Sequence, residues 1–165
     1  MKPTLLIIDV QNYVLDNYPG FKESVEKRAK VMNDAIALFR EKKLPLITVY
    51  HEDKKEGPRP GSKEFEFSPD INIRNTDTRV IKNYPNAFNK TELEELLRTT
   101  SSDTIMITGL SAIGCALATY MGAIDLDLEP YFVSDGVAAD TEEHVKFAED
   151  ICRTITVDDL RMTLS

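Results

Sequence analysis

The chain has 165 residues, 42% hydrophobic and 29% charged, which is the composition of an ordinary globular protein. This length suits one domain, and we expect residues 1–165 to form a single domain with a sizeable core. A net charge of −8 argues against nucleic acid or an anionic membrane as the main partner, because both attract a basic face.

Strands and helices alternate along the first half of the chain. Residues 4–9 form a continuous apolar run, typical of a strand buried on both faces. Helical periodicity follows over 22–43, and strands are expected over 44–50 and 78–81. Residues 51–78 are charged and rich in proline and glycine, and a loop of this length indicates a functional or a mobile segment.

The second half continues this alternation. Thr91 and Glu94 have the spacing of a capping box, which predicts a helix from there to about Arg98. The other predicted elements are strands over 103–108, 129–134 and 154–157 and helices over 113–124 and 141–152. Alternation of this kind predicts βαβ units, a parallel sheet and right-handed crossovers.

The sequence also indicates a cellular compartment. It has two cysteines, far apart and without a C-x-x-C motif, so a disulfide framework is not expected. We see no secretory leader at its start and no apolar stretch long enough to span a bilayer. We therefore expect a cytoplasmic protein in a reducing environment.

Cys115 is the most informative single residue. It opens the predicted helix after the strand at 103–108, where unpaired backbone N–H groups and the helix dipole favour the thiolate. Thiolate is the nucleophilic form, which indicates covalent catalysis. A lone cysteine is more often a buried packing residue, so this stretch alone leaves both interpretations open.

Two other polar residues fall at the ends of predicted strands, Asp9 and Lys82. Ligands of open parallel sheets bind at the carboxyl ends of the strands, where the strand order reverses. There Asp9 could take the thiol proton and later activate water, while Lys82 lowers the thiol pKa and holds Asp9. Alternatively, Asp9 is a turn former and Lys82 a solvated strand end.

Four stretches of this sequence resemble the isochorismatase-like cysteine hydrolase family, which includes nicotinamidases, N-carbamoylsarcosine amidohydrolases and ureidoacrylate hydrolases. They are similar to the opening strand with D-x-Q-N, the K-x-x-Y-S-A-F segment, the T-G-(x)5-C turn and the S-D-A/G strand end of that family. Here they read LLIIDVQN at 5–12, VIKNYPNAF at 80–88, TGLSAIGC at 108–115 and VSDG at 133–136. Together they cover nearly the whole chain in the order and spacing of the family.

The resemblance implies a Rossmann-like, three-layer α/β/α fold with a six-stranded parallel sheet in the order 3-2-1-4-5-6. It implies a catalytic triad of Asp9, Lys82 and Cys115. It also implies a cis peptide between Leu110 and Ser111, which would place the Ser111 N–H beside that of Cys115 in an oxyanion hole.

The same resemblance extends to the substrate and to assembly. Gln11, Tyr84 and Phe88 are the candidate substrate-binding residues. The expected partner is a small-molecule substrate, and relatives of this kind assemble as homo-oligomers, here a dimer or a tetramer.

The sequence departs from the metal-dependent members of the family. Nicotinamidases hold a metal with Asp-x-His and a further His, whereas this chain has Tyr50-His51-Glu52-Asp53 and only one other histidine, His144. His144 is expected on a helix surface, so we expect no metal and no cofactor. Tyr13, Val14 and the residues 112–114 also differ from the family pattern and are expected to alter the pocket wall. Cys152 is expected in the core.

From these residues we expect an amidohydrolase-type cysteine hydrolase that cleaves a C–N bond of a small amide or ureido compound through a covalent acyl-thioenzyme. Two alternatives stay within the family: an isochorismatase-type ether hydrolase, and a catalytically silent member that serves as a binding or assembly unit. A third is a nucleotide-binding module, but no G-x-G-x-x-G or G-x-x-x-x-G-K-[ST] follows any strand.

Overall fold

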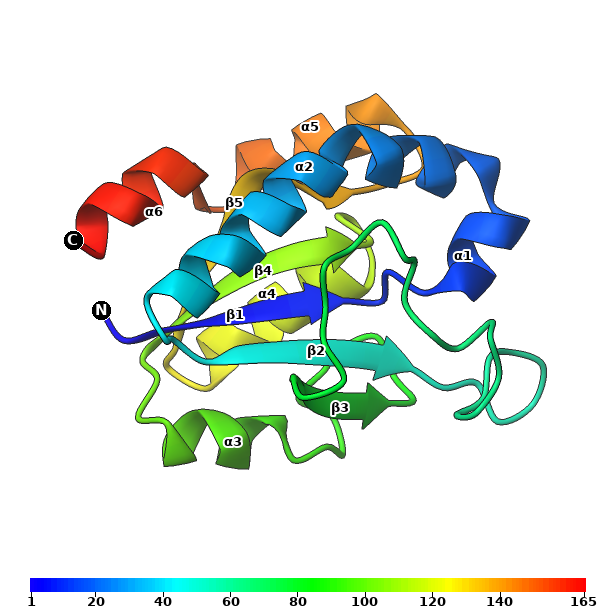
Figure 1. Ribbon diagram of the computed structural model, residues 1–165, viewed down its shortest axis with the longest axis horizontal. Coiled ribbons are helices and arrows are strands. Elements are labelled where there is room, and N and C mark those ends of the chain that lie inside the picture. The colour runs from blue at the N-terminus through cyan, green and yellow to red at the C-terminus, as the bar shows by residue number, and fades with distance from the viewer.

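The computed structural model describes residues 1–165 and is built around a six-stranded parallel sheet (Figure 1). The strand order is β3-β2-β1-β4-β5-β6, as predicted. The strands are β1 (Pro3–Ile8), β2 (Leu46–His51), β3 (Thr78–Lys82), β4 (Thr104–Leu110), β5 (Glu129–Ala138) and β6 (Thr154–Ile155). Because β1 pairs with both β2 and β4, the strand order reverses at the centre of the sheet.

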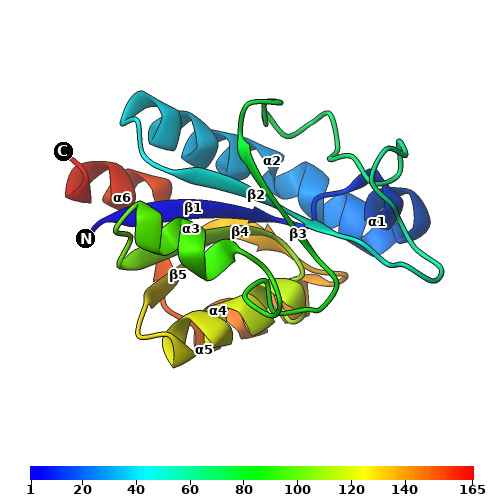
Figure 2. The ribbon, with the colours of Figure 1, turned by 90° about the horizontal axis from the view of Figure 1, so that it is seen from below.

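Helices cover both faces of the sheet (Figure 2). One face carries α1 (Asn12–Asn17), α2 (Pro19–Glu41) and α6 (Val157–Thr163); the other carries α3 (Leu93–Thr99), α4 (Cys115–Asp125) and α5 (Glu142–Ile151). None of these helices has the length and apolar composition needed to cross a membrane.

The fully buried strand β1 connects the two halves of the core. Successive side chains of a strand point to opposite faces. Leu5 and Ile7 accordingly belong to the cluster under α2, while Leu6 and Ile8 belong to the cluster under α4. The continuous apolar run at 4–9 therefore supplies both layers of the core at once.

Several element boundaries differ from the sequence expectation. The short helices α1 and α6 were not predicted. Helix α2 begins at Pro19, earlier than the expected start at residue 22, because proline at the first helical position suits a helix start. The strand expected to end at Ser134 continues to Ala138, with a register shift against β4 between Ile107 and Gly109. Asp135 takes a left-handed φ of 57° in this irregular stretch.

The predicted capping box at α3 is wrong. The N-cap residue is Glu92, and it makes no side-chain capping hydrogen bond. The Thr91 hydroxyl instead donates to the Ala87 carbonyl oxygen and accepts a bond from the Leu93 N–H. The helix therefore starts later than predicted, and the box does not form because the Thr91 oxygen accepts from the Leu93 N–H and not from the Glu94 N–H three residues on.

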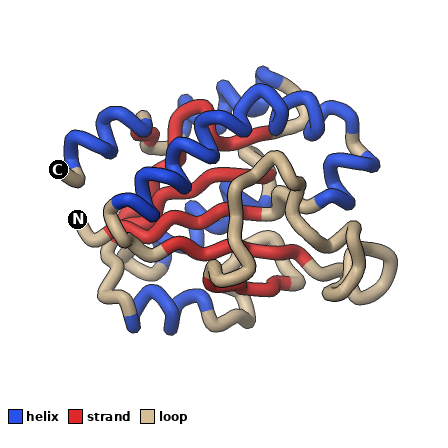
Figure 3. Tube along the Cα trace, viewed as in Figure 1, coloured by secondary structure: helices blue, strands red, loops and turns tan.

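The long connection between β2 and β3 is tied to the core (Figure 3). Phe65 and Phe67 are buried, and their rings lie 5.0 and 4.5 Å from the ring centroid of Tyr50 in β2. Burial of two aromatic side chains stabilises an otherwise irregular segment by several kcal/mol, at about 1.5–3 kcal/mol each. The loop thus has a defined path near the carboxyl ends of the strands.

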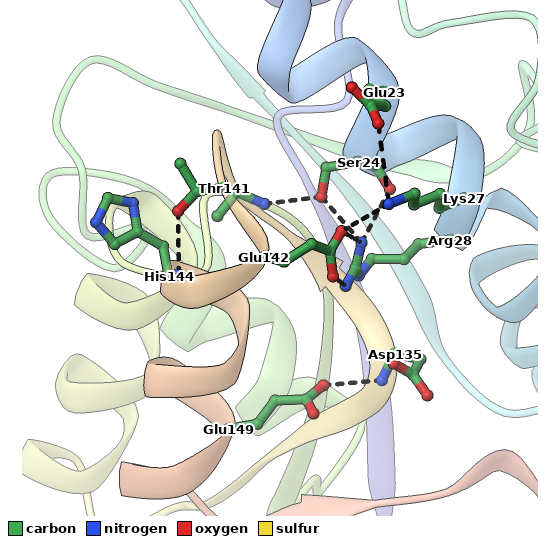
Figure 4. A network of polar contacts seen from close by, with 10 residues as sticks. Glu23, Ser24, Lys27, Arg28, Asp135, Thr141, Glu142, His144 and Glu149 are labelled. Carbon is green, nitrogen blue, oxygen red and sulfur yellow. Dashed lines mark hydrogen bonds and ion pairs between the residues drawn. The ribbon is translucent and has the colours of Figure 1, made fainter.

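An ion-pair network joins α2 to α5 beside the edge of the sheet (Figure 4). The buried Arg28 guanidinium donates two hydrogen bonds to Glu142, at 3.1 and 2.8 Å, and a third to Ser24 Oγ at 3.1 Å.

Strand β6 pairs only with Phe132 and Val133, so the later part of β5 has no strand partner on that side. There the Asp135 N–H donates to Glu149 Oε1 instead.

Candidate active site

Asp9, Lys82 and Cys115 meet at the carboxyl ends of the strands. Lys82 Nζ lies 2.9 Å from Asp9 Oδ2 and 3.3 Å from Cys115 Sγ. The Lys82 side chain is completely buried and Asp9 is 5% exposed. The trio predicted from strand-end positions is therefore one contact cluster at the point where the strand order reverses.

The strands fix each of these three side chains. Asp9 follows the last residue of β1 and has a left-handed φ of 58°, a conformation that aspartate tolerates better than most residues. Its N–H donates to the Val49 carbonyl oxygen at 2.9 Å, which continues the β1–β2 pairing. Lys82 ends β3 opposite His51 of β2.

The turn from β4 to α4 places Cys115 over two free backbone donors. The Leu110–Ser111 peptide is cis, and Gly114 caps the helix that Cys115 opens. The Gly114 N–H donates to the Ser111 carbonyl oxygen at 2.9 Å. The N–H groups of Ser111 and Cys115 have no acceptor within the protein, so both are available to an anion at the site.

The preceding glycine is required by close packing. Gly109 has a φ of +104°, and a Cβ at this position would overlap the Ile8 carbonyl oxygen. Only glycine fits there, because both the backbone conformation and the closeness of β1 exclude a side chain. The approach of β4 to β1 thus holds the Cys115 turn next to Asp9.

Charge at the site favours the thiol, contrary to the sequence expectation of a thiolate. The pKa of Cys115 is raised to about 12, chiefly by burial, and the neighbouring Asp9 carboxylate raises it by more than Lys82 lowers it. Asp9 Oδ1 is buried and has no hydrogen-bond partner, so it is free to accept a proton.

His51 is the contact that sequence reasoning missed. Its Nδ1 lies 3.1 Å from Lys82 Nζ, so the ammonium has three neighbours: Asp9, Cys115 and His51. Burial and the positive charge of Lys82 lower the pKa of His51. The available signal was its position at the end of the second strand, the same rule that selected Asp9 and Lys82.

A cavity of about 290 Å³ opens beside Cys115. Its walls come from the start of the chain after β1 and from the loop after β2. Besides Asp9, His51 and Cys115, the lining residues are Gln11, Tyr13, Val14, Tyr18, Asp53, Gly57 and Pro58. The long 51–78 loop is thus part of the candidate site, and Tyr13 and Val14 do lie in the pocket wall.

The three candidate substrate-binding residues have different positions. Gln11 lines the cavity but is only 1% exposed, and its side chain bonds both the N–H and the C=O of His51, at 2.8 and 3.0 Å. Tyr84 lines a neighbouring pocket that also includes His51, and Phe88 packs against the core under α4. Neither Tyr84 nor Phe88 lines the cavity at Cys115.

The remaining sequence candidates lie elsewhere. His144 is exposed on α5 and contacts Asp140, and Cys152 is half-buried against the core. No group of three or more His, Cys, Asp or Glu side chains is arranged to hold a metal ion. The cavity brings together the Cys115 thiol, the Asp9 carboxylate and the His51 imidazole, and the buried Lys82 ammonium contacts all three.

A sequence model of the isochorismatase domain matches residues 3–157. The chain belongs to the isochorismatase family. It is 27% identical over 140 residues to YrdC, an uncharacterized isochorismatase family protein of Bacillus subtilis (strain 168), with 84% of this chain and 74% of YrdC covered.

Solved structures share this fold over nearly the whole chain. An isochorismatase-like hydrolase from Alkaliphilus metalliredigens superposes with a TM-score of 0.88 at 21% identity, covering 100% of both chains. N-carbamoylsarcosine amidase from Thermoplasma acidophilum superposes with a TM-score of 0.81 at 22% identity, covering 96% of this chain and 98% of that one. At these identities the comparison establishes the fold of the isochorismatase family and not a substrate.

Proposed function

We propose that this isochorismatase-family protein is a cysteine hydrolase that cleaves a C–N bond of a small amide or ureido compound. One observation carries the proposal: buried Lys82 contacts both Asp9 and Cys115, and these two residues line a small cavity beside two free backbone N–H groups. These are the nucleophile, base and anion-binding donors that acyl transfer requires.

The reaction begins from a neutral thiol. Asp9 Oδ1 takes the proton of Cys115 while Sγ attacks the carbonyl carbon of the substrate, so no free thiolate has to persist. The negative charge that develops on the carbonyl oxygen is held by the N–H groups of Ser111 and Cys115. Lys82 stabilises the charged groups of this step because it contacts both Asp9 and Cys115.

Asp9 then completes the turnover. The protonated carboxyl group gives its proton to the leaving nitrogen, the C–N bond breaks, and the acyl group stays on Sγ as a thioester. Water enters, Asp9 removes its proton as the oxygen attacks the thioester, and the C–S bond breaks. The acid product leaves and the proton returns to Cys115. The likeness in fold to an N-carbamoylsarcosine amidase supports this choice of C–N bond.

The test is hydrolysis of a panel of small carboxamides, ureido compounds and carbamoyl compounds, together with a vinyl ether substrate. Cys115→Ala and Cys115→Ser should lose turnover of the accepted compound while keeping the unfolding temperature of the wild type. Cys152→Ala is the matched control, because it removes the other thiol, which lies outside the cavity. Wild-type rates in Cys115→Ala would contradict the mechanism, and cleavage of the ether alone would favour the isochorismatase-type reaction.

A further inference from the structure

The buried Ser24 hydroxyl of α2 bonds the backbone just beyond β5. Ser24 is 4% exposed, and its Oγ accepts from the Ala139 N–H at 3.2 Å and from Arg28 Nη1 at 3.1 Å (Figure 4). The pairing of β5 with β6 ends at Val133, so no strand offers an acceptor to the Ala139 N–H on this side. Ser24 Oγ is therefore the only acceptor that this buried donor has.

The Ala138–Ala139 peptide group carries this connection across β5. A peptide unit is planar, and in the trans form, which this one has, its N–H and C=O point in opposite directions. The N–H of the unit donates to Ser24, and its C=O accepts from the Ala112 N–H at 2.8 Å. A displacement at Ser24 therefore tilts one rigid group and moves the acceptor of Ala112.

A second peptide group extends the connection to both sides of Cys115. The Ala112 N–H and the Ser111 C=O belong to the same unit. That carbonyl oxygen accepts from the N–H groups of Gly114 and Ala116, at 2.9 and 3.1 Å, and these two residues flank Cys115. The direction of the Cys115 N–H, one of the two proposed anion donors, thus depends on a series of hydrogen bonds that begins in α2.

We propose that Ser24 is a positioning residue for acyl transfer, which acts through these two peptide groups to aim the N–H groups of Ser111 and Cys115. The inference rests on the proposed function and deepens it, because it assigns the support of the anion-binding turn to a residue that does not line the cavity. Hydrogen bonds in series polarise one another and hold a single arrangement. A displacement of about 1 Å at a catalytic group can cost about 100-fold in rate, so such support matters.

The experiment compares two reactions of Cys115 that differ in their need for the anion-binding donors. With p-nitrophenyl acetate, Sγ attacks the ester carbonyl carbon and negative charge develops on the carbonyl oxygen. The C–S bond forms, p-nitrophenolate leaves, and the thiol proton passes to Asp9. With iodomethane, Sγ displaces iodide from a carbon that bears no oxygen, and the thiol proton again passes to Asp9.

Both rates are measured in the Cys152→Ala background, so that Cys115 is the single thiol. The acylation rate is the initial release of p-nitrophenol, corrected for the release by the protein that also carries Cys115→Ala. The methylation rate is read at the Cys115 peptide by mass spectrometry. The measured quantity is the ratio of acylation to methylation.

Ser24→Ala removes the acceptor of the Ala139 N–H and should lower the acylation rate by roughly 10–100-fold. The methylation rate should stay within about twofold of wild type, because that reaction uses Asp9 and needs no anion-binding donor. Ser24→Thr keeps the hydroxyl oxygen and should restore most of the acylation rate. Ser68→Ala is the matched control and should leave the ratio unchanged. Ser68 is also buried, and its Oγ accepts a backbone N–H, that of Asp70, outside this series of bonds.

The outcomes separate this inference from the proposed function. If Ser24→Ala lowers neither rate, or lowers both equally, Ser24 has no positioning role and the inference is overturned, while the hydrolase proposal stands. Equal losses of acylation in Ser24→Ala and Ser24→Thr also overturn it, because the hydroxyl oxygen would not be the cause. If wild-type Cys115 is methylated but not acylated, the proposed function fails and the inference fails with it. Unfolding temperatures establish that each variant is folded, and the ratio in Ser24→Ala decides by itself if Ser24→Thr does not fold.

Discussion

Lys82 Nζ lies 2.9 Å from Asp9 Oδ2 in the interior of the protein, where the lysine side chain is fully buried and the aspartate side chain is nearly so. Removal of one partner from such a pair leaves an uncompensated buried charge, which is costlier than loss of both charges together. Loss of either partner alone is therefore expected to destabilise the protein and to disturb the proposed chemistry.

We predict that Lys82→Met lowers the free energy of unfolding by about 3 kcal/mol, because the Asp9 carboxylate loses its counter-ion. The double variant Lys82→Met/Asp9→Asn should recover part of that loss, which urea unfolding of the two single variants and the double variant measures. If the costs of the single variants simply add, the two side chains are not energetically coupled.

Asp9→Asn should leave the cavity in place and remove the proposed general base. We expect turnover of an accepted amide to fall by roughly 10²–10⁴-fold, the range for loss of a general acid–base group, together with slower alkylation of Cys115. Steady-state kinetics and iodoacetamide labelling at pH 7 measure both effects. Unchanged labelling would mean that Asp9 does not receive the thiol proton.

The pKa of Cys115 makes a prediction about alkaline pH. The thiol has a pKa of about 12 in the folded protein, above its ordinary value of 9.0, so the folded state holds this proton more tightly. The contribution to stability is complete below pH 9 and is lost as the pH rises toward 12. Urea unfolding should show a slope of up to roughly 1.4 kcal/mol per pH unit in this window. The slope should be smaller in Cys115→Ala. An equal slope in this variant and in the wild type would contradict the raised pKa of Cys115.

Gly109→Ala should destabilise the protein by about 3 kcal/mol, because the new methyl group meets the Ile8 backbone and φ is +104°. Gly61→Ala is the matched control, since Gly61 also has a positive φ, of +90°, but a methyl group added there would have no atom within 4 Å. It should cost only about 1 kcal/mol. Thermal unfolding of the two variants distinguishes crowding from backbone strain, and equal losses would leave strain as the sole cause.

The contact between Arg28 and Glu142 predicts a loss of stability in acid. The Arg28 guanidinium lowers the pKa of Glu142 to about 2 from an ordinary 4.5. This contribution is present above pH 4.5 and is lost as the pH falls toward 2. At pH 7, Glu142→Gln should cost about 1–2 kcal/mol, because solvent screens the half-exposed carboxylate. The difference from wild type should vanish near pH 2.

The control for this contact is Glu143→Gln. Glu143 lies in the same first turn of α5 and feels the same helix dipole, but it has no ion pair with Arg28. Its variant should remain close to wild type between pH 7 and pH 2. Similar losses for Glu142→Gln and Glu143→Gln would assign the effect to the helix dipole instead of Arg28.

The strand order and the Asp9–Lys82–Cys115 cluster could be predicted because buried strands are continuous apolar runs and their ends converge in a parallel sheet. The ionisation of Cys115 could not, because it depends on burial and on its distance to Asp9, which the sequence does not contain. His51 stands at the end of the second strand, which the sequence does indicate, but its partner could not be predicted. Its Nδ1 contact with Lys82 depends on the register of β2 against β3.

Helix boundaries were the weakest predictions. The capping box at Thr91 failed because the threonine oxygen accepts from the Leu93 N–H and not from the Glu94 N–H, a local geometry that the sequence does not reveal. The two short helices at 12–17 and 157–163 have too few residues for a clear hydrophobic period. The path of the 51–78 loop depends on Phe65 and Phe67 reaching Tyr50 across the core, a long-range contact.

The reacting groups and the outer wall of the cavity have separate supports in this fold. Asp9 and Lys82 stand at the ends of β1 and β3, and Cys115 stands at the start of α4. Asp53, Gly57 and Pro58 instead belong to one loop whose anchors, Phe65 and Phe67, are farther along the chain. A duplicated gene can therefore drift at 53–58 and acquire a new ligand preference while it inherits the same reaction. Substitutions in that short segment would reshape this part of the cavity wall without touching the reacting groups.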